Sequence, residues 1–506
     1  WAREELPPES VAKLENKLFK EGFEPFLDAW PNAGECWLHF FTHNWPSVIA
    51  AEIGLAALSM VGRYERAPEV VELVLRTILR TFSDKGEEGD WDEGLIYLAY
   101  GTYAPCLLGH ALWMASDGEL DLFTHPFIQH IGDYVLHMTR PEGGAFNYSD
   151  CGTGDSSVFA SVSSLMGLLA THYRNPTWQW HVRAFGPPGT PEMLPLLDAE
   201  LASETPDLST TRHFYPTGVV TTRSDWSSDA LYVGFRNRGT ASRPYIMTAH
   251  QHGDVNSFVL SAFGEPLVID PPTPDYTYHH AGDPCPVPWW DSTGHSVLLF
   301  DGQGQQRTKE ADYGQIRMYE ANDEWVHVVG CADGAYQHLD ASHFRHLVLI
   351  DNAYLLIVDY IGVDRRRRVT WNLPHLGKSE IGERTARIAR PNAVLEVHCL
   401  LDDRPVYPTR FTFPRLSRWN VGKTSGDDWD VNDTVEVLSF NTCFEPGDVH
   451  LWPFLLFPVR PGETPPKIVE HSVDNNGFQA VVQRGDITET LYIGKHNFMF
   501  RYKRND

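Results

Sequence analysis

The sequence predicts an α+β chain of more than one domain, with a helical first part followed by antiparallel strands. At 506 residues the chain is too long for one ordinary core, so two or three domains are expected. Apolar residues recur at helix spacing through the first third of the chain. From His213 onward the apolar period becomes two, which is the period of a strand with one buried face.

The predicted helices are joined by short connections rich in Gly, Pro, Asp and Asn. Consecutive helices joined in this way pack as antiparallel hairpins. We expect about six or seven helices before Pro187, and the clearest periods span 12–20, 47–60, 68–82, 94–115, 120–139 and 158–173. A Pro/Gly cluster at 187–191 and the polar stretch after it predict a linker. The helical domain is therefore expected at 1–190 and the linker at 191–212.

Turn residues separate the predicted strands at short intervals, which is typical of a large antiparallel β-sandwich. We expect this sandwich at 213–417, with strands at 218–223, 230–235, 257–260, 346–350, 354–358 and 369–373. Strand character continues from about Arg418 in the segments 434–440, 478–484 and 490–494. These predict a further β segment at 418–506.

The composition excludes some classes of protein. The net charge is −26, from 67 acidic and 41 basic residues, which disfavours nucleic acid as a partner but leaves an anionic polysaccharide open. The 16 Trp and 20 Tyr suit a carbohydrate binder, although most aromatic residues belong to cores. No apolar run approaches the roughly 20 residues of a membrane span. Seven scattered cysteines without a CxxC pair predict neither a thiolate metal cluster nor a disulfide framework.

The stretch His250-Gln251-His252-Gly253-Asp254 is the most informative part of the sequence. In a strand its two histidines and its aspartate would share one face. Asp270 ends a strand-like run downstream, and His295 opens another one. Two histidines and an aspartate are ligand types that zinc prefers, so these segments predict a metal site with a further histidine beside it. A hydrogen-bonded cluster without metal is the alternative.

Two polar clusters stand out in the helical part. His43-Asn44-Trp45-Pro46 precedes an apolar helix, and the segment alone leaves open whether Asn44 caps that helix or has a functional role. Tyr97 and Tyr100 are three residues apart and share a helix face. Without further context these tyrosines fit a core or its rim as well as a catalytic site.

Taken together, these stretches resemble the heparinase II/III-like superfamily of polysaccharide lyases and uronyl epimerases, and also the lyase-like domain of dermatan sulfate epimerase. The resemblance covers nearly the whole chain and rests on the order and spacing of HNW at 43–45, EGxxYxxYGT at 93–102, GVVTTRSDW at 218–226, HxHxDxxSF at 250–258, VID at 268–270 and GHSVLLFDGQGQ at 294–305. It implies an α/α toroid, an antiparallel β-sandwich and a smaller C-terminal β domain. Because about 190 residues are few for such a toroid, we expect it to be abridged or to have begun before Trp1.

The resemblance also implies the chemistry of β-elimination on a uronate. Asn44 matches the residue that hydrogen-bonds the uronate carboxylate, Tyr97 the tyrosine that acts as base, acid or both, and His250 the histidine that can take the proton of the opposite epimer. One position departs from several relatives, which carry a histidine where Trp45 stands. Either Asn44 neutralises the carboxylate alone, or His43 assists it.

For the metal, the resemblance implies one structural zinc ion held by His252, Asp270 and His295. This ion would fix the segment that carries His250, and Asp254 is expected to anchor the turn or to orient a histidine instead of binding metal.

Substrate contacts are expected from charged and aromatic residues near these stretches, with a structural role as the open alternative for each. Arginines suit carboxylates or sulfates, and long loops often carry binding residues. The candidates are Tyr100, Arg236, Arg238, Tyr276, Tyr278, Trp289 and Trp290.

We therefore expect a lyase acting on an anionic uronate polysaccharide, with glycosaminoglycans such as hyaluronan, chondroitin or heparan sulfate first and alginate second. A uronyl C5-epimerase and a non-catalytic polysaccharide-binding protein are the alternatives. The chain begins at Trp1 without an apolar leader, so we expect that a native leader has been removed. A secreted or periplasmic location is expected, although the N-terminus does not show it. The oligomeric state stays open.

Overall fold

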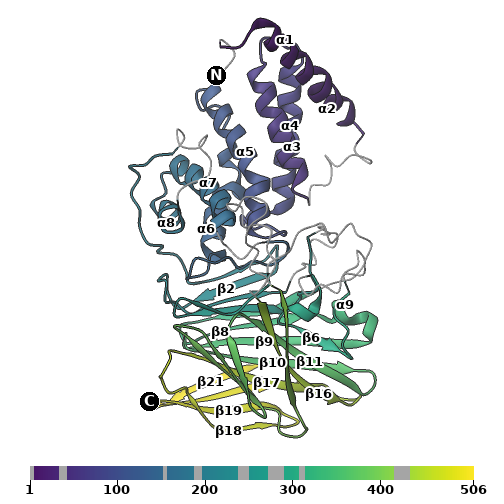
Figure 1. Cartoon of the computed structure of the whole chain (residues 1–506), viewed down its shortest axis with the longest axis vertical. Coiled ribbons are helices and arrows are strands. Elements are labelled where there is room, and N and C mark those ends of the chain that lie inside the picture. Colours follow the sequence, from purple (N-terminus) through teal and green to yellow (C-terminus); the bar gives the residue numbers. More distant parts are fainter. Residues whose placement is uncertain are drawn as a thin grey trace. The chain divides into compact units, whose positions relative to one another are not determined.

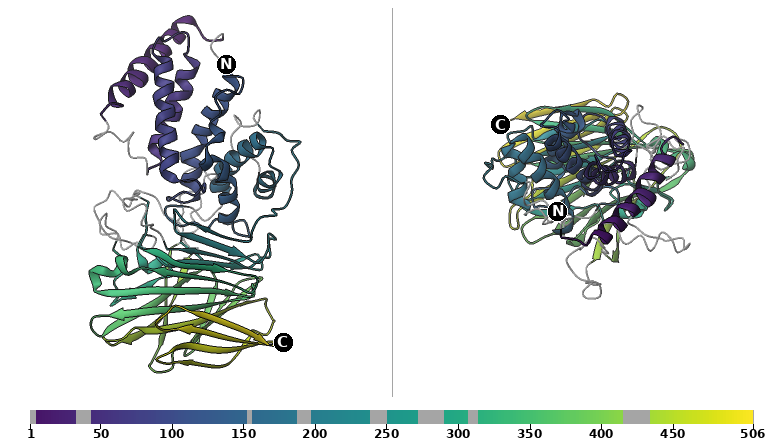
Figure 2. Two further views of the ribbon diagram at one scale, coloured as in Figure 1. Left: turned by 180° about the vertical axis from the view of Figure 1, so that it is seen from behind. Right: turned by 90° about the horizontal axis from the view of Figure 1, so that it is seen from above.

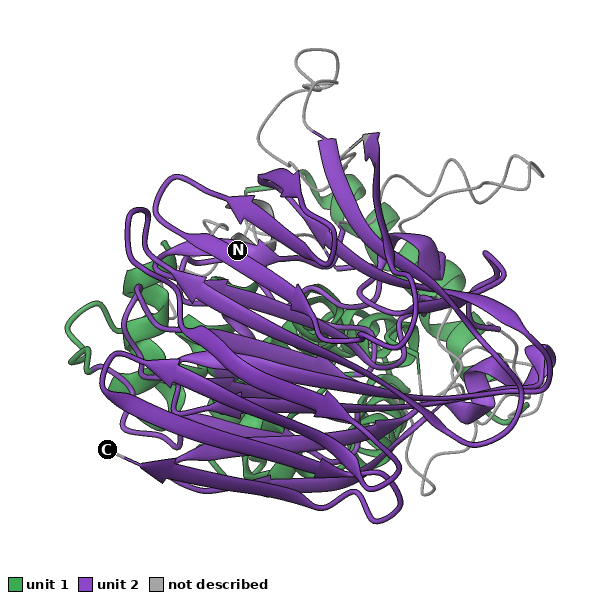
Figure 3. Cartoon of the chain, turned by 90° about the horizontal axis from the view of Figure 1, so that it is seen from below, with its two compact units in different colours: residues 1–91, 95–136, 159–204 green, residues 92–94, 137–158, 205–506 purple. Residues whose placement is uncertain are grey.

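The computed structural model of the chain describes residues 5–32, 43–151, 156–186, 197–237, 250–271, 290–306, 314–414 and 434–505. These residues form helices and antiparallel sheets (Figure 1), which confirms the α+β class. The chain divides into two compact units (Figure 3). The helical unit comprises 1–91, 95–136 and 159–204, and the strand unit comprises 92–94, 137–158 and 205–506.

The helices follow the predicted periods with a few differences. Their bounds are α1 Pro8–Lys17, α2 Glu24–Ala29, α3 Trp45–Ser59, α4 Ala67–Lys85, α5 Leu95–Ala115, α6 Pro126–Met138, α7 Ser156–Tyr173 and α8 Pro176–Phe185. The helix predicted at 120–139 begins only at Pro126, because proline suits the first turn of a helix and breaks its interior. A 3₁₀ turn at Leu122–Thr124, capped by Asp121, comes before it. Helix α8 follows the capping side chain of Asn175.

Helix α3 is apolar on every side because it packs against two other helices, α4 and α5 (Figures 1 and 2). Helix α4 is amphipathic and buries Val70, Val74, Ile78 and Phe82, which recur every four residues. At Gly54 of α3 an added Cβ would lie 2.7 Å from the side chains of both Val74 and Leu108. The missing side chain therefore permits the close approach of the three helices.

Within its described residues, the strand unit contains four antiparallel sheets. A five-stranded sheet runs in the order β1 Thr211–Phe214, β2 Val219–Arg223, β3 Tyr232–Arg236, β4 Ser257–Ala262 and β5 Glu265–Val268. An eight-stranded sheet has the order β12 Lys378–Ile381, β13 Thr385–Ala389, β14 Val394–Cys399, β17 His450–Val459, β10 Tyr354–Val363, β9 Ala341–Ile350, β8 Trp325–Cys331 and β7 Gln315–Ala321.

Two four-stranded sheets complete the unit. The first has the order β15 Tyr407–Pro414, β16 Thr434–Phe444, β11 Arg367–His375 and β6 Leu298–Phe300. The second has the order β18 Lys467–Val473, β19 Gly477–Arg484, β20 Ile487–Gly494 and β21 Phe500–Asn505. Strands on both sides of the predicted boundary at 417 share two sheets, since β16 pairs with β11 and β17 pairs with β10.

The eight-stranded sheet has an apolar core on each face. In β9 the alternation of a strand sends Leu347 and Leu349 into a core shared with the five-stranded sheet and with β6, β11 and β16. Val348 and Ile350 enter a second core, shared with β19 and β20. Burial is therefore continuous over residues 346–350 of β9 and nearly so along β10, because both faces of these strands are covered.

Within the described residues, no helix has the length and apolar character that crossing a membrane would require. The described cysteines, at 106, 151, 331, 399 and 443, are all free thiols.

Candidate active site

In the helical unit, Asn44 lies directly before α3 and is fully buried. Its backbone is already helical, and its side chain makes no capping hydrogen bond to α3, which disfavours the capping interpretation. The Ser47 hydroxyl lies 2.9 Å from the carbonyl oxygen of Asn44 and 2.7 Å from that of Gly101 in α5. At Gly101 an added Cβ would lie 2.6 Å from the Trp91 ring and 3.5 Å from Cβ of Asn44. Close packing against α5 therefore fixes Asn44.

Tyr97 and Tyr100 both lie on α5, and their rings meet edge to face with centroids 6.5 Å apart. Tyr97 is 9% exposed, whereas Tyr100 is 52% exposed. Trp45, at the start of α3, is also 52% exposed, and its backbone N–H donates to Nδ1 of His43 at 3.3 Å. The helical unit thus combines a buried asparagine and a nearly buried tyrosine with exposed aromatic rings.

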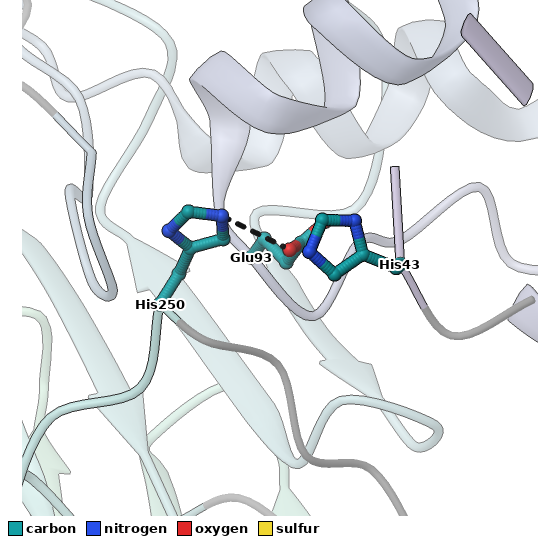
Figure 4. Close-up of side chains that lie close together, drawn as sticks. All are labelled: His43, Glu93 and His250. Carbon is teal, nitrogen blue, oxygen red and sulfur yellow. Dashed lines mark ion pairs between the residues drawn. The ribbon is translucent and has the colours of Figure 1, made fainter. Parts of the chain in front are cut away.

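In the strand unit, His250 lies between two buried carboxylates, those of Glu93 (Figure 4) and Asp150. Its Nδ1 is 2.7 Å from Oδ2 of Asp150, and its Nε2 is 3.4 Å from Oε1 of Glu93. Each ring nitrogen therefore faces a hydrogen-bond acceptor. A histidine held in this way keeps a fixed orientation and can exchange a proton at Nε2.

The segment through His250, His252 and Asp254 is not a strand, so the shared face that a strand would give them does not apply. The segment from 250 to 256 is irregular, and β4 begins at Ser257. A turn precedes the strand, because the Ser257 N–H donates to the Asp254 carbonyl at 3.0 Å and Asn256 has a φ of +68°. Turn geometry, and not the two-residue period of a strand, sets the directions of the two histidines.

His252, Asp270 and His295 come together as a buried cluster, with their ligand atoms within 4.8 Å of one another. Nδ1 of His295 lies 3.2 Å from Oδ2 of Asp270, and the His252 and His295 rings are 5.3 Å apart. Two imidazoles and one carboxylate at this separation fit zinc. These are the three residues that the sequence predicted as ligands.

Asp150 orients the first of these histidines. Oδ1 of Asp150 lies 2.8 Å from Nε2 of His252. Burial lowers the pKa of His252, although Asp150 opposes this shift, so the ring is neutral at pH 7. With its hydrogen on Nε2, the neutral ring presents the lone pair of Nδ1, as a metal ligand must.

Asp150 itself is ionised. Burial would raise the pKa of its carboxyl, but the two imidazoles that hydrogen-bond to it, His250 and His252, outweigh burial and lower that pKa well below its ordinary value. Neither Asp150 nor Glu93 was among the predicted site residues. Glu93 stands inside one of the recognised stretches, whereas Asp150 lies in a polar segment without any periodic pattern.

The other candidate residues have different surroundings. Arg236 is 2% exposed, lies 3.8 Å from the centroid of the Tyr148 ring and pairs with Asp254 at 3.3 Å. These contacts favour the structural alternative for Arg236 and give Asp254 the anchoring role that was expected. Arg238, Tyr276, Tyr278 and Trp289 lie outside the described residues.

A buried ionic network supports the loops that carry the histidines. Asp359 in β10 accepts from His343 at 2.8 Å and from Nε and Nη2 of Arg345 at 2.8 and 2.9 Å. Arg345 also donates to the carbonyl oxygens of Asn256 and Ser296. Asn256 lies four residues after His252, and Ser296 directly follows His295. The network therefore ties the segments that carry these two histidines to the eight-stranded sheet.

Comparisons with known proteins agree with this fold. The family model described as "Heparinase II/III-like, C-terminal" matches residues 233–407, a range that includes His250 and the three metal-site residues. A search of curated proteins found no match.

Three solved structures are similar over most of the chain. A heparan sulfate lyase from Pedobacter heparinus is 13% identical with a TM-score of 0.69, over 96% of this chain and 69% of that one. A heparinase III gene product is 14% identical with a TM-score of 0.69, over 96% and 68%. A further heparinase III is 12% identical with a TM-score of 0.66, over 92% and 69%. The family match identifies residues 233–407 as a heparinase II/III-like C-terminal domain, in agreement with the predicted superfamily, and the chain shares its fold with the three solved structures.

Proposed function

We propose that the protein is a polysaccharide lyase that cleaves a uronate-containing chain by β-elimination, with glycosaminoglycans as the first class of substrate and alginate as the second. The observation that carries the proposal is the buried His250 held by Glu93 and Asp150 beside a zinc-type donor set. The heparinase II/III-like domain matched at 233–407 and the shared fold with a heparan sulfate lyase and with heparinase III support it.

The proposed reaction removes the C5 proton of the uronate, forms the C4=C5 double bond and expels the O4 leaving group, which takes up a proton. Asn44 hydrogen-bonds the uronate carboxylate and stabilises the enolate that forms. Tyr97 is the base, the acid or both, and His250 takes the C5 proton of the opposite epimer through Nε2, since Asp150 holds its Nδ1. Asn44 and Tyr97 are residues of the helical unit, and His250 is a residue of the strand unit.

The same relatives suggest the finer architecture that we propose. The helices α1–α8 would belong to an α/α toroid, and the sheets would form a β-sandwich with a smaller C-terminal β domain. The exposed Trp45 and Tyr100 would stack on sugar rings next to Asn44 and Tyr97.

A panel of polymers tests the proposed function. Incubation with hyaluronan, chondroitin sulfate, dermatan sulfate, heparan sulfate and alginate should give unsaturated uronate ends on at least one of them, seen as a rise in ultraviolet absorbance. Solvent deuterium at C5 without chain cleavage would instead identify a uronyl C5-epimerase. Binding without any product after long incubation would identify a non-catalytic binding protein.

We also propose that His252, Asp270 and His295 hold one structural zinc ion. When bound, the ion would cross-link three segments and so stiffen the turn that carries His250. We expect about one equivalent of zinc per chain in protein never exposed to chelator, and less than about one-tenth in His295→Ala. Elemental analysis of both proteins measures this.

His213→Ala is the matched control for this experiment, since His213 lies in β1 of the strand unit and outside the cluster. It should keep the zinc content of the wild type. A wild-type protein with less than about one-tenth of an equivalent would reduce the cluster to a hydrogen-bond network.

A further inference from the structure

The carboxylate of Asp150 is the meeting point of three side chains of the strand unit. Oδ2 lies 2.7 Å from Nδ1 of His250, and Oδ1 lies 2.8 Å from Nε2 of His252. The indole N–H of Trp290 donates to Oδ1 at 2.9 Å. Asp150 is completely buried, so solvent does not compete for these contacts.

We propose that Asp150 is a positioning residue that couples the metal site to the proton-transferring histidine, with one carboxylate oxygen assigned to each. His252 is a member of the zinc-type donor set, and His250 is the residue to which the proposed function gives the proton transfer. The inference rests on that function for the role of His250. The coupling itself rests on the geometry of one carboxylate and two imidazoles.

The segment that carries Asp150 is fixed from several sides. The Asn147 side chain donates to the backbone carbonyl of Asp270 at 3.0 Å, so the same segment also contacts the carboxylate ligand of the metal site. The Ser149 hydroxyl donates to the carbonyl of Asp92 at 3.3 Å, and Ser149 has a φ of +58°. Asp150 is thus positioned by contacts that do not depend on the two histidines.

Only a carboxylate can serve both rings in this arrangement. It accepts a hydrogen bond on each oxygen, whereas an amide of the same size has one acceptor and one donor. In Asp150→Asn one imidazole N–H would therefore face an NH₂ group. That ring must rotate, change its tautomer or lose the bond, while the overall shape of the side chain is kept.

Two measurements without substrate test the coupling. The zinc affinity of metal-free Asp150→Asn, measured by competition with a chromophoric chelator, should be about 10–100-fold weaker than that of the wild type, as for other partners of ligating histidines. Crystal structures of both proteins with zinc bound should show the His250 ring rotated or displaced in the variant. Unchanged zinc affinity, or an unchanged His250 ring, would overturn the shared role.

A kinetic measurement then separates positioning from metal loss. The substrate is the polymer that the wild type cleaves. At a zinc concentration that saturates Asp150→Asn, its kcat should stay at least about 10-fold below the wild-type value, and its KM should change by less than about 3-fold. Full recovery of kcat by added zinc would restrict Asp150 to the metal site and overturn the inference. If the wild type cleaves no polymer, the proposed function fails, while the zinc and crystal measurements still decide the coupling.

Glu489→Gln is the matched control, because it also converts a buried carboxylate of the strand unit into an amide. Glu489 lies in β20 and accepts hydrogen bonds from Tyr354, Tyr502 and Arg484. Its zinc affinity, its His250 ring and its kcat should match those of the wild type. A loss equal to that of Asp150→Asn would show a general cost of removing a buried charge and would overturn the inference.

Discussion

Tyr97→Phe is expected to lower kcat on the cleaved polymer by about 10²–10⁴-fold, which is the usual contribution of a general acid or base. The substitution removes only the phenolic oxygen, and the ring keeps its place in α5 beside Tyr100. Because the side chain is only 9% exposed, the apolar packing that holds it is retained. The rate of appearance of unsaturated uronate, at saturating substrate, measures the effect.

Tyr103→Phe is the control for this variant. Tyr103 lies on the same helix, six residues away and so about 120° around its axis. It should keep wild-type kcat, and both variants should unfold at the wild-type temperature. Wild-type activity in Tyr97→Phe would remove this tyrosine from the mechanism.

Asp359→Ala is expected to destabilise the strand unit by about 3–5 kcal/mol, because it leaves the Arg345 charge buried without its partner. The Asp359 carboxylate accepts two hydrogen bonds from Arg345 and one from His343. A lower midpoint of urea unfolding, followed by tryptophan fluorescence, would show the loss. Glu396→Ala, in the same sheet but in a partly exposed pair with Arg387, should cost less than about 1 kcal/mol.

The same pair predicts a dependence of stability on pH. Burial raises the pKa of Asp359, but Arg345 and His343 outweigh it and lower this pKa from 3.8 to about 2. Since the folded pKa is the lower one, the contribution is complete at about pH 5 and above and is lost as the pH falls through about 2. The loss amounts to about 2 kcal/mol. An equal acid slope in wild type and Asp359→Ala would contradict this assignment.

The sequence predicted the fold class and the clustering of His252, Asp270 and His295 through two different kinds of information. Helix and strand periods identify elements because burial of one face repeats along the chain, as in α4 and β9. The trio of His252, Asp270 and His295 was predicted from ligand types and family resemblance, although the strand invoked for His252 does not exist. The ligand types of these residues thus predicted that they cluster, although the backbone conformation assumed for His252 was not the observed one.

The sequence did not predict that Asp150 and Glu93 contact His250, and the reason is physical. Asp150 lies 100 residues before His250, and a single hydrogen-bonding carboxylate leaves no periodic trace. For Arg236 the sequence left both a substrate contact and a structural role open, and its buried pairing with Asp254 favours the structural role. Such long-range contacts between single polar groups are set by the tertiary fold and not by any local sequence pattern.

The interleaving of the two units limits how this protein can be cut. The strand unit takes residues 92–94 and 137–158 from within the helical part of the chain. A fragment starting at 205 would keep all the zinc-type ligands but would lack both Glu93 and Asp150. A chimera of two related proteins joined near residue 205 would thus take His250 from one protein and Glu93 and Asp150 from the other. To keep the site intact, a chimera has to take 92–94, 137–158 and 205–506 from the same protein.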